Sequence, residues 1–266
     1  MILLIIAVII VLQINKETNP DAVRFKDSNL ERAIREEIDK RRGDILKSDL
    51  EEITQLFAER KGISSLEGME YLVNLETLSI YWNEIDDISP LVELTSLTDL
   101  NLYWNEISDV SPLANLTNLE ALSLRKNRIK DIEPLSQLTS LKWLTLSDNN
   151  IGDISVLSNL TNLENLSLWS NQITNISALS ELKNLKKLDL SYNQISDISP
   201  LEELTNLEDL NLSSNQINEV LSLSNLKNLT RLHLHRNQIS DITPLDELGS
   251  LYDLGILDNP IESNSN

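Results

Sequence analysis

The chain has 266 residues, of which 41% are hydrophobic and only 4% aromatic, and its formal net charge at pH 7 is -20. Such an acidic surface repels phosphate backbones, which argues against nucleic acid as a partner. The absence of cysteine excludes disulfides, thiolate metal sites and a cysteine nucleophile. The abundance of leucine, isoleucine and asparagine favours an architecture that stacks one kind of side chain repeatedly.

An unbroken apolar run, Ile2–Leu12, opens the chain. The run has the length of a signal-peptide core and is too short for an ordinary transmembrane helix. No basic residue precedes it, and no clear cleavage site follows. We interpret residues 1–15 as a signal-like or anchor segment and expect any membrane attachment to be confined to it. The alternatives are an uncleaved anchor, a misassigned start codon and a frayed apolar arm.

A helical N-terminal cap is predicted for residues 16–49. Ser28 with Glu31 has the pattern of a capping box, and Ser48 begins a weaker one. A cap is required because a bare terminal coil would expose leucines and a strand edge. The amphipathic stripe that follows the first box consists of Leu30, Ile34 and Ile38.

From residue 50 to residue 262 the sequence repeats every 22 residues. Residues 50–71 form a degenerate first coil, in which Lys61 occupies the position of a recurrent asparagine. Each asparagine is followed by an isoleucine two residues later and, in most coils, by the pattern D-I-x-P-L; a polar tail, 263–266, ends the chain. The asparagine ladder consists of Asn83, Asn105, Asn127, Asn149, Asn171, Asn193, Asn215, Asn237 and Asn259.

The spacing within one repeat predicts its structure. The pattern L-x-L indicates a strand whose two leucines point the same way. A buried asparagine at the following turn must bond backbone groups of its own and the neighbouring coil. Asp87 and its equivalents are well placed to cap a short 3₁₀ turn, and 22 residues leave no room for a longer helix. We therefore predict an α/β leucine-rich-repeat solenoid with nine parallel strands on its concave side and 3₁₀ turns on its convex side.

The residues just before each ladder asparagine vary while the framework stays constant, which predicts a partner-binding surface. Large aromatic side chains here would add nothing to the core and would leave apolar area exposed. Replacement of Trp104 is accordingly expected to weaken binding and barely to alter folding. The predicted partner-binding residues are Tyr81, Trp82, Tyr103, Trp104, Arg125, Lys126, Trp143, Trp169, Tyr192 and His235.

Other candidate sites are weaker. His233 and His235, the only histidines, face the same way on one strand, but a third metal ligand is poorly supplied. The aspartates of the D-I-x-P-L pattern fall one per coil, where capping accounts for them without calcium. We find no nucleophile–base pair and no glycine-rich phosphate loop, so we predict no enzyme activity, no metal site and no cofactor.

The repeat N-x-I-x-D-I-x-P-L-x-x-L-T-x-L at 83–97 and 105–119 resembles the 22-residue repeat of the internalin family of bacterial surface proteins. The segments 62–63 and 68–72, with the helical cap before them, also resemble that family's N-terminal cap. The resemblance covers roughly residues 21–262 and implies a right-handed curved solenoid that binds a protein partner. The chain lacks an L-P-x-T-G sorting signal and recognisable wall-binding modules, so host-cell invasion is not carried over.

Three functions compete. The first is an exported or surface module that binds a protein, with a glycan as the alternative ligand, through its concave face. The second is a cytoplasmic scaffold resembling the leucine-rich-repeat regulator of type 1 phosphatases; the apolar N-terminus and the cap motifs argue against it. The third, an enzyme with an unrecognised site, is disfavoured for want of acid–base or nucleophilic groups.

Overall fold

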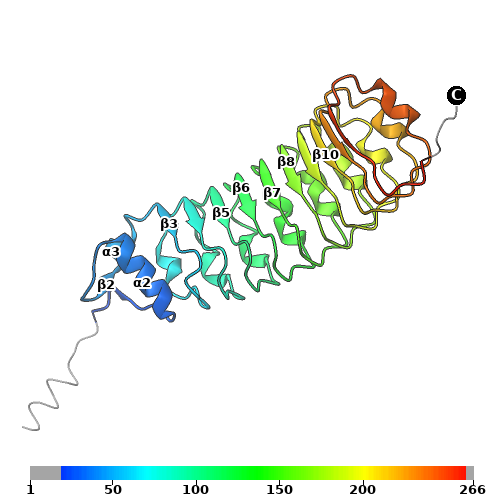
Figure 1. Ribbon diagram of the computed structural model, residues 1–266. Coiled ribbons are helices and arrows are strands. Elements are labelled where there is room, and N and C mark those ends of the chain that lie inside the picture. Colours follow the sequence, from blue (N-terminus) through cyan, green and yellow to red (C-terminus); the bar gives the residue numbers. More distant parts are fainter. Residues whose placement is uncertain (1–18, 262–266) are drawn as a thin grey trace, which may run out of the picture.

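The computed structural model describes residues 19–261, so the predicted signal-like segment 1–15 and the polar tail 263–266 lie outside it. The described chain forms an elongated stack of coils with a small cap at its N-terminal end (Figure 1). Strands line one side of the stack and short helical turns line the other. The predicted solenoid architecture is confirmed.

Ten parallel strands form one sheet, ordered in space as in sequence from β3 to β12. Neighbouring strands pair residues 22 apart, as Leu78 with Leu100, so every coil has the same register. The sheet has one strand more than predicted, because the degenerate coil 50–71 contributes β3. The strands are β3 (Gln55–Phe57), β4 (Thr77–Ser79), β5 (Asp99–Asn101), β6 (Ala121–Ser123), β7 (Trp143–Thr145), β8 (Asn165–Ser167), β9 (Lys187–Asp189), β10 (Asp209–Asn211), β11 (Arg231–His233) and β12 (Asp253–Gly255).

The opposite side of each coil from β3 to β11 carries a 3₁₀ turn, as the 22-residue length predicts. Asp87 accepts a hydrogen bond at 2.8 Å from the backbone N–H of Ser89, the first residue of its turn. Asn175 replaces the aspartate in its coil and accepts the same bond from Ser177 at 2.9 Å. The turns are η1 (Met69–Tyr71), η2 (Ser89–Leu91), η3 (Ser111–Leu113), η4 (Glu133–Gln137), η5 (Ser155–Asn159), η6 (Ser177–Glu181), η7 (Ser199–Leu201), η8 (Leu221–Leu223) and η9 (Thr243–Glu247).

The ladder asparagines bond the backbone of two coils, as predicted. Asn127 donates from Nδ2 to the carbonyls of Leu102 and Leu124, both at 3.0 Å. Its Oδ1 accepts from the N–H of Ile107 at 3.0 Å. Within residues 19–261 no buried side-chain nitrogen or oxygen lacks a hydrogen-bond partner, so hydrogen bonds offset the desolvation of the buried asparagine side chains.

A second asparagine column, which we did not predict, runs along the surface. Asn118 donates from Nδ2 to the carbonyl of Thr95 at 2.8 Å, and this bond is exposed. The same bond, to a carbonyl 23 residues earlier, is made by Asn74, Asn162, Asn184, Asn206 and Asn228.

The N-terminal cap contains two helices, α2 (Ser28–Glu37) and α3 (Lys47–Leu50), and an antiparallel ribbon of β1 (Ala22–Val23) with β2 (Ile45–Leu46). The ribbon was not predicted, because two-residue strands leave no periodic signal. Helix α2 buries Leu30, Ala33 and Ile34 and contacts β3. The first strand of the sheet is therefore covered.

The predicted capping boxes are displaced, the first by one residue and the second by two. The N-cap of α2 is Asp27, which accepts from the backbone N–H groups of Asn29 and Leu30 at 2.8 and 3.0 Å, and Ser28 is the first helical residue. The second oxygen of Asp27 accepts from the backbone N–H of Ser64, at 2.9 Å, and so ties the cap to the first coil. Burial raises the pKa of Asp27, but these hydrogen bonds outweigh it and lower the pKa overall. In α3 the N-cap is Leu46 rather than Ser48, and the side chain of Asp49, in place of Glu51, accepts from the N–H of Leu46 at 2.7 Å.

Candidate functional site

The turn that ends each strand decides where the variable residues lie. The residue immediately before each ladder position has a φ between 54° and 62°, from Arg60 to Asp258. This left-handed conformation costs a non-glycine residue about 1–2 kcal/mol. It turns the side chain away from the direction that strand alternation would give. Trp82, Trp104 and Lys126 all occupy this position.

Four of these side chains form a column. The rings of Trp82 and Trp104 stack with centroids 4.1 Å apart and planes 18° from parallel. The Arg60 guanidinium lies over Trp82, 4.4 Å from the ring centroid, and the Lys126 ammonium lies over Trp104 at 3.3 Å. The stack is thus a pair of tryptophans between two cations. We call Arg60, Trp82, Trp104 and Lys126 the cation–tryptophan column.

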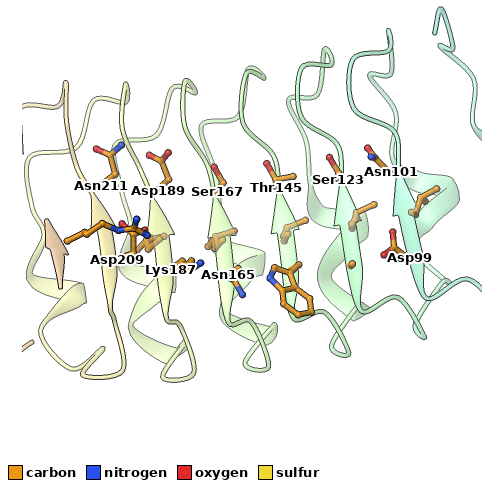
Figure 2. Close-up of a pocket in the computed structure, with 18 of the residues that line it drawn as sticks. Asp99, Asn101, Ser123, Thr145, Asn165, Ser167, Lys187, Asp189, Asp209 and Asn211 are labelled. Carbon is orange, nitrogen blue, oxygen red and sulfur yellow. The ribbon is translucent and has the colours of Figure 1, made fainter. Parts of the chain in front are cut away.

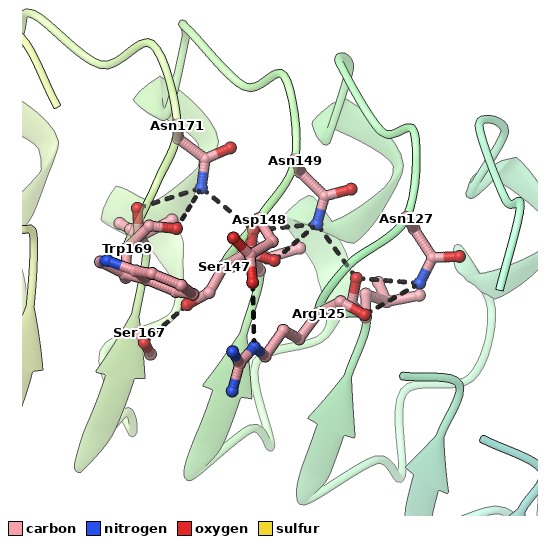
Figure 3. A network of polar contacts seen from close by, with 11 residues as sticks. Arg125, Asn127, Ser147, Asp148, Asn149, Ser167, Trp169 and Asn171 are labelled. Carbon is pink, nitrogen blue, oxygen red and sulfur yellow. Dashed lines mark hydrogen bonds and ion pairs between the residues drawn. The ribbon is translucent and has the colours of Figure 1, made fainter. Parts of the chain in front are cut away.

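A second row of aromatic side chains lies beside the column, one residue earlier in each coil. The rings of Tyr81 and Tyr103 are 6.2 Å apart. The Arg125 guanidinium lies 5.4 Å from the Tyr103 ring and 5.0 Å from the Trp169 ring. It reaches Trp169 two coils away because the coil between them carries only the small Ser147 at this position (Figure 3).

The aromatic contacts continue to Tyr192, just after strand β9. Trp169 meets Tyr192 edge to face at 6.1 Å. The Nε of Arg125 is held in place by an ion pair with Asp148 at 3.2 Å (Figure 3). We call the column together with Tyr81, Tyr103, Arg125, Trp169 and Tyr192 the aromatic ridge. Eight of the ten predicted partner-binding residues therefore lie on one continuous surface, and Arg60 joins them.

Trp104 is better packed than we predicted. The ring is only partly exposed and has Trp82 on one face and Lys126 on the other. A stacked aromatic pair contributes about 0.5–1.5 kcal/mol beyond the area that it buries. We therefore expect Trp104→Ala to cost some stability through the lost stack, in addition to its effect on binding.

The middle of the sheet forms a separate hollow, a groove of about 610 Å³. Its polar side chains stand in two rows, one from the first and one from the last residue of each strand (Figure 2). Trp143 lines this groove rather than the aromatic ridge and is 52% exposed. Desolvation in the groove raises the pKa of Asp99. The polar rows are Asn101, Ser123, Thr145, Ser167, Asp189, Asn211 and His233, and Asp99, Asn165, Lys187, Asp209, Arg231 and Asp253.

The two histidines lie toward the C-terminal end of the sheet. The Nε2 of His233 is 3.3 Å from a carboxylate oxygen of Asp253, and the Nδ1 of His235 accepts from the N–H of Leu257 at 3.1 Å. A Cβ at Gly255 would lie 2.1 Å from the Nε2 of His235, so glycine makes room for that ring. The coil between Tyr192 and His235 carries only serines at the ridge positions, so His235 is separated from the aromatic ridge.

One aromatic side chain escaped the sequence analysis. Phe57, the last residue of β3, is 55% exposed on the same face as the row that begins with Asn101. The degenerate coil lacks the asparagine that set the alignment of the other rows. Counting four residues back from Lys61 would have found it.

Comparison with known proteins agrees with this geometry. The family described as Leucine Rich repeats (2 copies) matches residues 95–137, 117–160, 139–181, 183–225 and 205–247, together more than half of the chain. The structure is similar to internalin C2 of Listeria monocytogenes, with 39% identity and a TM-score of 0.77 over 79% of this chain and 94% of that one. It is also similar to internalin F of the same organism, with 34% identity and a TM-score of 0.64 over 88% of this chain and 83% of that one. This chain belongs to the internalin-like leucine-rich-repeat family.

A plant receptor is also similar to this internalin-like protein. It is the peptide hormone receptor RGFR1 in complex with RGF2, at 28% identity and a TM-score of 0.60 over 71% of this chain and 37% of that chain.

Within residues 19–261, the internalin-like protein has no helix that is long and apolar enough to span a membrane. The same residues contain no group of three or more histidine, aspartate or glutamate side chains that could hold a metal ion.

Proposed function

We propose that this internalin-like protein is a non-enzymatic binding module that holds a protein partner against its sheet side, with the aromatic ridge as the anchor. The observation that carries the proposal is the cation–tryptophan column. A framework asparagine or leucine has the same neighbours in every coil, whereas the column exists only where four particular side chains follow one another. Tryptophan, tyrosine and arginine are also the residues that most often dominate binding energy.

The ridge is suited to binding because it is ordered in advance. The backbone beneath it is fixed by the asparagine ladder, and the rings hold one another at stacking distance. A partner would therefore meet side chains whose rotamers are already restricted, so little ordering cost accompanies association. The plant receptor supports a peptide or protein ligand, because a related solenoid was solved in complex with one.

A binding experiment with ridge variants tests the proposal. The purified chain is immobilised, and retained proteins are compared between the wild type and the Trp82→Ala/Trp104→Ala double variant. We expect the double variant to lose about 2 kcal/mol or more of affinity, about thirtyfold, for the retained partner. Because the stack also stabilises the fold, circular dichroism must first show that the variant is folded.

Two control variants locate the site. Tyr252 is 76% exposed outside the ridge, so Tyr252→Ala should leave the affinity unchanged. Trp143→Ala distinguishes the ridge from the polar groove. If Trp143→Ala abolishes retention and the ridge variant does not, the groove rather than the ridge is the binding site.

We also propose that the protein acts outside the cytoplasm. The support is the apolar run Ile2–Leu12, which has the length of a signal-peptide core, and the membership of an internalin-like family. Deletion of residues 2–15 should leave the protein in the cytosol, whereas the full chain should be found in the membrane or extracellular fraction. A full chain that fractionates with soluble cytosolic proteins contradicts export.

A further inference from the structure

Most cations of the solenoid are neutralised by a neighbouring coil. Arg128 pairs with Glu106 at 3.0 Å, and Lys142 pairs with Glu120 at 2.7 Å. Lys186 pairs with Glu164 at 2.7 Å. Within residues 19–261, Arg60 and Lys126 make no ion pair, although the chain has 42 acidic and 22 basic residues. Lys130, Lys183 and Lys187 also make no ion pair within the described residues, but among these cations only Arg60 and Lys126 lie over tryptophan rings.

The tryptophans orient these charges without neutralising them. A ring face attracts a cation through its quadrupole, but it carries no net charge. Both Arg60 and Lys126 are exposed, so donors that do not face a ring remain free to bind an acceptor. Two positive charges are thus held at a fixed separation, with a flat apolar stack between them.

We propose that the segment of the partner that docks on the aromatic ridge is acidic and that its carboxylates pair with Arg60 and Lys126. This inference rests on the proposed function. Charge complementarity selects the occupant, because isolated carboxylates suit two separated cations. The net charge of -20 repels any anion, but it opposes a nucleic acid or an anionic membrane, which carries many charges, far more than a segment with two carboxylates.

The geometry also fixes the spacing of those carboxylates. The guanidinium of Arg60 lies 4.4 Å from the Trp82 ring, the two tryptophan rings lie 4.1 Å apart, and the ammonium of Lys126 lies 3.3 Å from the Trp104 ring, so the two charges are no more than about 12 Å apart. An extended peptide advances about 3.3 Å per residue and places alternate side chains on one face. Residues four apart therefore span about 13 Å on the same face. The docking segment then reads acidic-x-apolar-x-acidic, with the apolar side chain against Trp82 and Trp104.

Selection from a library of random peptides of about twelve residues, long enough when extended to cover the sheet, tests this inference. The probes are the enriched peptides themselves, made synthetically. We expect them to carry two acidic residues four positions apart with an aromatic or aliphatic residue midway. Their affinity should fall about tenfold for Arg60→Gln/Lys126→Gln and should weaken as salt is added.

Matched variants keep the test decisive. Lys130→Gln/Lys183→Gln removes the same charge from two exposed lysines that also make no ion pair within residues 19–261, and it should leave the affinity unchanged. Arg60→Lys/Lys126→Arg keeps the charge and should retain binding. Thermal melting of each variant checks that it is folded.

The outcomes separate this inference from the proposed function. If the enriched peptides need Trp82 and Trp104 but lack the acidic pair, or bind Arg60→Gln/Lys126→Gln as well as the wild type, the acidic segment is wrong and the aromatic anchor stands. If no peptides are enriched, or if the enriched peptides are indifferent to the tryptophans, both proposals fail.

Discussion

At the scale of single residues, the ladder asparagines and the surface asparagines show how burial sets the value of a hydrogen bond. Asn127 makes its bonds in the buried turn between two coils. Asn118 makes one bond to Thr95 in contact with solvent. When the side chain is removed, water can replace the exposed bond of Asn118, but it cannot reach the buried partners of Asn127.

Asn127→Ala should therefore destabilise the protein by about 1–3 kcal/mol, because it leaves buried backbone groups without partners. Asn118→Ala is the matched control and should cost clearly less. Urea denaturation followed by circular dichroism measures both. Equal unfolding midpoints for the two variants would contradict the structural role of the ladder.

At the scale of the element, the 3₁₀ turns η2 to η7 and η9 are each preceded by a side chain that accepts the first N–H of the turn. The first residue of the turn donates from its backbone N–H and from its side-chain hydroxyl, and both bonds lower the pKa of Asp109, Asp153 and Asp241. The backbone bond is the stronger cause in these three. In Asp197 the side-chain bond from Ser199 is the stronger of the two. In these four turns folding therefore favours the charged form of the aspartate.

This predicts a loss of stability in acid. A carboxyl whose pKa is lowered by folding stabilises the native state above its unfolded pKa of about 3.9. That contribution disappears as the pH falls through the lower folded value. We therefore expect the urea midpoint to fall as the pH is lowered below about 4. Asn175 shows that asparagine can accept the same bond, so replacing the four aspartates by asparagine should flatten this part of the profile; an unchanged slope would assign the acid sensitivity to other groups.

At the scale of the whole molecule, the two ends of the sheet differ. Strand β3 is contacted by α2, whereas in the described residues β12 pairs only with β11. Leu254 is 39% exposed in β12, although its equivalents in the middle of the sheet are buried. A repeat protein is stabilised by contacts between nearest neighbours, so a coil with one neighbour opens more easily.

Hydrogen exchange followed by mass spectrometry should detect this asymmetry. Backbone amides of 253–257 should exchange faster than those of the equivalent segment 77–81, which is flanked on both sides. The central coils should be the slowest. Equal protection at 253–257 and 77–81 would show that the last coil is as stable as an internal one.

The sequence by itself determined the coil, because every framework position is set by contacts that repeat at one spacing. Leucines 22 residues apart share one core, and each asparagine bonds its own and the preceding coil. The 3₁₀ turns of the convex side follow from the 22-residue length of the coil, which leaves no room for a longer helix. The cap was harder to predict, since the bond from Ser64 to Asp27 joins residues 37 apart and no periodicity reports such a contact.

Only the tertiary structure decided how the variable side chains are grouped. The aromatic residues were visible in the sequence, but the left-handed turn that stacks Trp82 on Trp104 has no local signal, since neither position is a glycine or an asparagine. Trp143 was placed with them by strand alternation, although it lies at the other end of its strand and lines the groove. Arg60 gained its role because a neighbouring coil places a ring beneath its charge. Such groupings depend on distances between coils, which exist only once the coils are stacked.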